Sequence, residues 1–63
     1  MELMKVEMAD GKYKIEQIPE GDKFKITIYE SGHKVISMSS KTAENYGGLS
    51  KMLAAYIKMF KED

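Results

Sequence analysis

Apolar and charged side chains alternate along most of the first forty residues, and this period of two predicts β-strands with one buried and one solvated face. Turn residues divide the region into four runs, at Asp10-Gly11, at Pro19–Asp22 and at Ser31-Gly32. The connections between the runs are short, which favours strands that pair antiparallel with their neighbours in sequence. We therefore expect a four-stranded antiparallel meander.

The first predicted hairpin has a register that satisfies both faces of the sheet. A two-residue turn at Asp10-Gly11 places Val6 opposite Ile15 on the apolar face and Glu7 opposite Lys14 on the other face. A shift by one residue would bring Val6 opposite Lys14. We expect the two-residue turn.

The second connection holds the single proline, Pro19, which we expect in a loop. Pairing Ile18 with Lys23 around a four-residue loop places Ile15 opposite Ile26. The apolar side chains of both strands then share one face of the sheet.

The third hairpin allows two registers. A two-residue turn at Ser31-Gly32 would direct Ile36 and Met38 to the solvated face. A three-residue loop that begins at Glu30 and has its glycine in the left-handed region keeps both residues on the apolar face. We expect the three-residue loop, which makes Tyr29 and His33 cross-strand neighbours.

The end of the chain has the apolar spacing of an α-helix, i, i+3, i+4, i+7, i+8, i+11. The residues of this stripe are Leu49, Met52, Leu53, Tyr56, Ile57 and Phe60. We expect a firm helix from Leu49 to Lys61, packed on the apolar face of the sheet. The segment Lys41–Gly48 is either a loop or a weak first part of the helix, because two successive glycines disfavour helix. The predicted fold class is α+β with the order β-β-β-β-α, in one domain over residues 1–63.

The length and composition of the chain bear on its oligomeric state and on the kinds of partner that we expect. A chain of 63 residues has a core that rarely supplies more than about 3–5 kcal/mol, so a homodimer stays an open alternative. There is no cysteine, and ten acidic residues balance ten basic ones. The balance gives no electrostatic reason to expect a nucleic-acid or membrane partner. We find no catalytic set, cofactor motif, metal site, signal peptide or long apolar run, and expect a soluble, cytoplasmic protein that is not an enzyme.

Two surfaces are candidates for binding a protein. The predicted edge strand His33–Ser39 has no proline and one lysine, and such an edge can accept a further strand. The helix flank beside the apolar stripe offers surplus apolar surface. The candidate residues on these two surfaces are His33, Lys34, Val35, Ser37, Ala55 and Met59.

These features predict a non-enzymatic protein-binding module, of the kind of small adaptor or inhibitor that phages and mobile elements encode. The partner's identity stays open. The alternative is a single-stranded nucleic-acid-binding protein that uses the outer face of the sheet, with a stacking aromatic among cations. The residues for this alternative are Lys14, Lys25, Tyr29 and Lys34.

Overall fold

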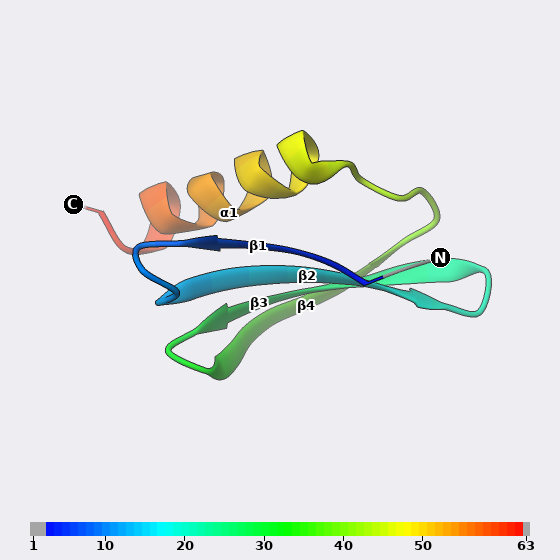
Figure 1. Cartoon of the computed structure of the whole chain (residues 1–63), viewed down its shortest axis with the longest axis horizontal. Coiled ribbons are helices and arrows are strands. Elements are labelled where there is room, and N and C mark those ends of the chain that lie inside the picture. Colours follow the sequence, from blue (N-terminus) through cyan, green and yellow to red (C-terminus); the bar gives the residue numbers. More distant parts are fainter. Residues whose placement is uncertain (1–2, 63) are drawn as a thin grey trace.

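The computed structural model describes residues 3–62 and contains one antiparallel sheet with a helix across one of its faces (Figure 1). The four strands lie side by side in sequence order. The elements are β1 (Met4–Met8), β2 (Tyr13–Glu20), β3 (Lys23–Glu30), β4 (His33–Ser40) and α1 (Tyr46–Phe60). The predicted α+β fold with a four-stranded meander is confirmed.

The predicted register of the first hairpin is also confirmed. Val6 lies opposite Ile15, and Glu7 lies opposite Lys14. The N–H of Lys12 donates to the carbonyl of Ala9 at 3.1 Å and closes the turn.

The predicted second connection is wrong by two residues. Glu20 pairs with Lys23 around a two-residue turn, so Ile15 lies opposite Ile28. Gly21 has φ 65 at the first turn position, where type II′ turns take glycine. A shift by two residues preserves the faces, which is why the apolar set still lies on one side.

Pro19 lies inside β2, opposite Phe24 of β3, and not in a loop. The strand tolerates it there because Gln17 is the last β2 residue that pairs with β1 in the described part of the chain. Within residues 3–62, β2 has a paired neighbour on one side only beyond Gln17, the situation in which strands accept proline.

The predicted three-residue loop in the third hairpin is wrong. Ser31 (φ 51) and Gly32 (φ 84) form a two-residue turn that closes the pair Glu30–His33. Tyr29 therefore lies opposite Lys34, and the expected Tyr29–His33 pair does not form.

A β-bulge corrects the orientation of β4 after this turn. Tyr29 pairs with Lys34 and Ile28 pairs with Ile36, so Val35 is the extra residue. The bulge returns Ile36 and the following Met38 to the side of the helix. The expectation that the apolar residues of β3 and β4 share a face is confirmed, although a bulge produces it.

Helix α1 begins at Tyr46, three residues before the predicted start, and ends at Phe60, one residue before the predicted end. Asn45 is its N-cap, and the Asn45 Oδ1 accepts a hydrogen bond from the Gly48 N–H at 2.7 Å. The cap satisfies a free donor of the first turn, which lets the helix include both glycines. Residues 41–45 lie outside the helix.

A buried glutamine fixes the approach to α1. Gln17 of β2 is 1% exposed, and its Nε2 donates to the Glu44 carbonyl at 3.0 Å. The Glu44 N–H donates in turn to the Gln17 Oε1 at 2.7 Å. These two bonds hold the connection before Asn45 against the sheet.

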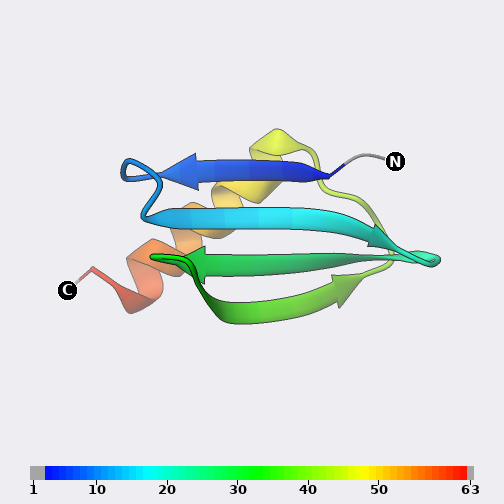
Figure 2. The same ribbon diagram turned by 60° about the horizontal axis from the view of Figure 1, so that its bottom comes forward.

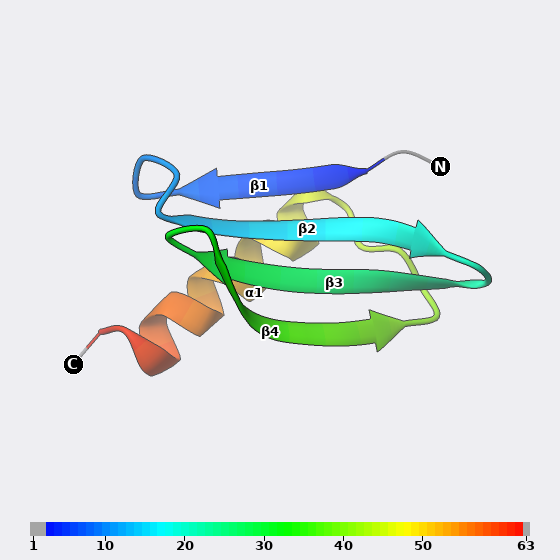
Figure 3. The ribbon, with the colours of Figure 1, turned by 90° about the horizontal axis from the view of Figure 1, so that it is seen from below.

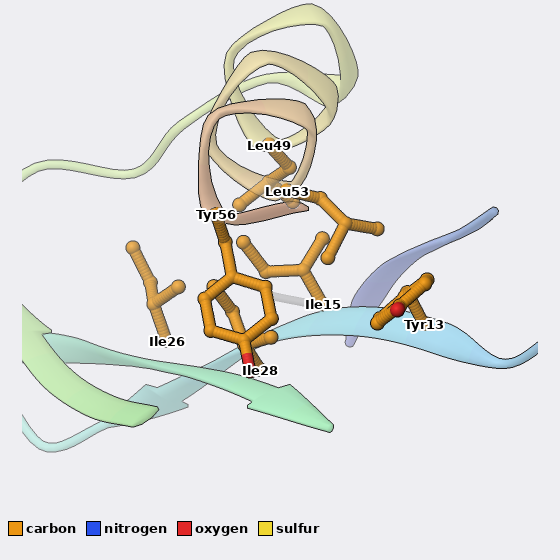
Figure 4. Packing of buried hydrophobic residues seen from close by; sticks show 7 residues of the cluster. All are labelled: Tyr13, Ile15, Ile26, Ile28, Leu49, Leu53 and Tyr56. Atoms are coloured by element: carbon orange, nitrogen blue, oxygen red, sulfur yellow. The ribbon is translucent and has the colours of Figure 1, made fainter. Parts of the chain in front are cut away.

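The core lies between α1 and the centre of the sheet (Figure 4). Its buried apolar residues are Tyr13, Ile15, Ile26, Ile28, Leu49, Leu53 and Tyr56. Met52 and Ile57 pack beside it, whereas Phe60 is 63% exposed. The last turn of α1 extends past the outline of the sheet (Figure 3), and the Phe60 ring lies against Tyr56 of the same helix, 5.4 Å between ring centres.

Candidate functional site

Helix α1 crosses the sheet obliquely and packs on β1 and β2 (Figure 2). A helix is about 10–12 Å wide and strands lie about 4.8 Å apart, so one helix covers about two strands. The helix side of β4 is therefore largely uncovered. Met38 is 37% exposed there, and Ile36 is half-buried.

One flank of α1 faces this uncovered side of the sheet. Figure 4 shows Leu53 directed toward the β1 side and Tyr56 directed toward Ile28 of β3. At 3.6 residues per turn, Met52 and Met59 project on the opposite side of Tyr56 from Leu53. They therefore lie on the flank of α1 that is nearer to β4.

We call the surface between this flank and β4 the open face. Its residues are Ile36, Met38, Met52, Ala55 and Met59. Met59 is 73% exposed and Ala55 is also exposed. No pocket is present in the part of the chain that the structure describes, so the open face is a shallow surface without an enclosed cavity.

The free backbone groups of β4 follow from the register. The two-residue turns close the pairs Glu20–Lys23 and Glu30–His33, and such closing pairs exchange both hydrogen bonds. Alternation along β3 and across the bulge then directs the backbone groups of Ile36 and Met38 toward β3. The N–H groups of Ser37 and Ser39 point outward from the sheet.

The predicted protein-binding residues divide between two places. Val35 and Ser37 lie along the β4 edge, with Val35 at the bulge. Lys34 lies opposite Tyr29 near the turn, and His33 lies opposite Glu30. Ala55 and Met59 lie on the open face together with three residues that the prediction did not include, Ile36, Met38 and Met52.

The sequence contained a signal for the two missed residues of β4. Met38 was expected in the core because it lies on the apolar face of β4. The width of one helix against four strands already implies that an edge strand stays partly uncovered.

An ionic cluster occupies the turn end of β3 beside the last turn of α1. The Lys61 Nζ lies 2.8 Å from the Glu30 Oε1, and the Tyr56 hydroxyl donates to the same oxygen at 3.4 Å. The hydrogen bond from Lys61 holds the pKa of Glu30 below its ordinary value, and the same bond raises the pKa of Lys61. This carboxylate is therefore occupied by groups of the same chain.

The outer face of the sheet brings together three of the four residues predicted for nucleic acid. Lys14, Tyr29 and Lys34 form one cross-strand row. The Lys14 Nζ lies 4.7 Å from the centre of the Tyr29 ring and 3.6 Å from the Glu16 carboxylate. Lys25 lies four residues away along β3, opposite Ile18 and outside this row.

Comparison with protein-family models, with curated proteins and with solved structures finds no match for this chain. Among the described residues, no helix has the length and apolar character needed to cross a membrane.

Proposed function

We propose that this chain is a non-enzymatic protein-binding module, a small cytoplasmic adaptor or inhibitor whose partner docks on the open face. The observation that carries the proposal is the exposure of apolar side chains from two elements on one side of the sheet. Met38 is 37% exposed on β4 and Met59 is 73% exposed on α1. Large apolar side chains exposed on one face of a small protein are typical of interaction sites.

The test is a tagged pull-down from the source lysate, treated with nuclease, with single substitutions Met38→Lys and Met59→Lys. We expect each to reduce capture of the partner about tenfold, since a loss of about 1.4 kcal/mol at an interface has that effect. Ile18→Lys is the matched control, because Ile18 is an apolar residue 39% exposed outside the open face. Undiminished capture by both methionine variants contradicts the proposal.

A second substitution separates docking on the open face from strand addition at the β4 edge. Ser37→Pro removes an outward N–H and leaves the pairs of Ile36 and Met38 with β3 intact. Docking on the open face predicts that Ser37→Pro retains the partner while Met38→Lys loses it. Loss with Ser37→Pro at unchanged circular dichroism would assign the interaction to the backbone edge.

Single-stranded nucleic-acid binding on the outer face is the second candidate, and the row of Lys14, Tyr29 and Lys34 is the observation that favours it. It predicts an affinity for an oligonucleotide that falls steeply with salt and drops when Lys14 and Lys34 are replaced by glutamine. Glu7 and Glu16 on the same face oppose a polyanion, which is why we rank this function second.

A further inference from the structure

We propose that the segment that docks on the open face is an acidic amphipathic α-helix that lies beside α1. This inference rests on the proposed function and specifies its partner. Packed helices lie about 8–10 Å apart. Because α1 packs on β1 and β2 and its Tyr56 already covers Ile28 of β3, a helix at that distance lies along the edge strand β4.

A helix in this position would cover the open face from two directions. It would contact Ile36 and Met38 from above and Met52, Ala55 and Met59 from the side. A strand added to β4 would extend the sheet outward and leave the α1 flank exposed. Shape therefore favours a helix over a strand.

The side chains of the open face suit helix packing. Ala55 is small and permits close approach of a second helix. Met38, Met52 and Met59 have flexible, polarisable side chains that adjust to an apolar partner. The partner helix therefore needs an apolar stripe, and the stripe need not have one fixed sequence.

Charge indicates the polar side of the partner helix. There is no Asp or Glu from Ser31 to Ala43 or from Asn45 to Lys61. Lys41, Lys51 and Lys58 of these segments are exposed, whereas Lys34 belongs to the outer face with Tyr29 and Lys61 pairs with Glu30. Lys51 and Lys58 precede and follow Ala55 by four and three residues, so they neighbour Ala55 on the helix surface.

The same charges argue against a second copy of this chain as the occupant. The α1 of a second copy would bring Lys51 and Lys58 again and no carboxylate with them. Lys61 already pairs with Glu30 of its own chain. In a partner helix, glutamates that flank the apolar stripe would place negative charge beside Lys51 and Lys58, and this pairing of opposite charges favours binding.

The experiment uses two synthetic helical peptides and the methionine methyl groups of the whole protein. Both peptides carry leucine on one stripe, and the remaining positions are mainly glutamate in one and lysine in the other. We expect the glutamate peptide to shift the methyl NMR signals of Met38, Met52 and Met59. Met4 and Met8 pack at β1 and are internal controls that should not move.

Charge reversal provides the matched comparison. We expect Lys51→Glu with Lys58→Glu to weaken binding of the glutamate peptide about tenfold, given about 0.2–1 kcal/mol for each exposed ion pair and added repulsion. Lys25→Glu changes charge in β3 away from the open face and should leave the affinity unchanged.

Three outcomes would overturn the inference alone, and a fourth would overturn the proposed function together with it. Equal shifts with both peptides would show an apolar face without charge selection. Shifts of the same methyl groups on raising the protein concentration alone would assign the face to a second copy. Absence of shifts with the glutamate peptide, while Met38→Lys still abolishes capture of the lysate partner, would reject the acidic helix and keep the proposed function. Undiminished capture by Met38→Lys and Met59→Lys would reject the proposed function itself.

Discussion

At the scale of single residues, Gln17 has the clearest structural role among the buried polar side chains. It donates to the Glu44 carbonyl and accepts from the Glu44 N–H. We expect Gln17→Leu to lower the free energy of unfolding by about 1–3 kcal/mol, because both Glu44 groups lose their partner. Urea denaturation followed by circular dichroism measures this. Thr27→Val is the control, since Thr27 is 3% exposed and has no side-chain hydrogen bond within residues 3–62; a comparable loss there would contradict the role of Gln17.

Glu30 makes stability depend on pH in the acidic range. Its pKa is lowered from 4.5, first by the hydrogen bond from Lys61. The interaction of Glu30 with Lys61 therefore stabilises the folded state fully at pH values above 4.5. This contribution to the free energy of unfolding is lost as the pH falls through the lower pKa that Glu30 has in the folded state. We expect Glu30→Gln to show a weaker decline in the free energy of unfolding between neutral and acidic pH. Parallel curves for Glu30→Gln and the unchanged protein would contradict this.

At the scale of elements, the N-terminal turn of α1 combines a good cap with poor helix formers. Replacing Gly47 by alanine should stabilise the protein by up to about 1 kcal/mol, since glycine is disfavoured by that amount inside helices. A Cβ at Gly47 would have its nearest atom, the Asn45 Oδ1, at 3.4 Å. Gly48→Ala should gain less, because its Cβ would meet the Glu44 carboxylate. Thermal unfolding of both variants tests the order, and a larger gain at Gly48 would contradict it.

The existence and type of each element could be predicted from the sequence, whereas two of the three registers could not. Period-two alternation fixes which face a residue occupies, and it cannot distinguish registers that differ by two residues. This ambiguity explains the misplaced pairing of Ile15 with Ile26. Strict alternation after a two-residue turn would place Ile36 on the outer face. The extra residue Val35 shifts the alternation of β4 by one position, so Ile36 and Met38 lie on the helix side of the sheet.

The candidate site was partly predictable for a different reason. Ala55 and Met59 followed from their place beside the helical stripe, and the β4 edge followed from the strand order. Whether the flank of α1 and β4 form one surface depends on the direction in which α1 crosses the sheet. The helical spacing of apolar residues does not specify this direction. Lys14, Tyr29 and Lys34 similarly share a row only because the second and third connections are two-residue turns.

At the scale of the whole molecule, stability is unevenly distributed over the sheet. β2 and β3 each pair with two neighbours, whereas β4 pairs with β3 alone and α1 packs on β1 and β2. We expect the amides of Ile36 and Met38, which point toward β3, to exchange hydrogen at least about tenfold faster than those of Glu16 and Thr27, which pair with each other between β2 and β3. Strands with less buried apolar contact open by local fluctuations that do not require global unfolding.

Hydrogen exchange followed by NMR also tests whether binding at the open face raises the local stability of β4. If the open face receives an acidic helix, the glutamate peptide covers Ile36 and Met38 and raises the free energy of local β4 opening. Protection should then increase in β4 and change little in β2, which α1 already covers. Equal protection of β2 and β4 before the peptide is added would mean that β4 opens only with the whole molecule. In that case the coverage by α1 would not determine local stability in this fold.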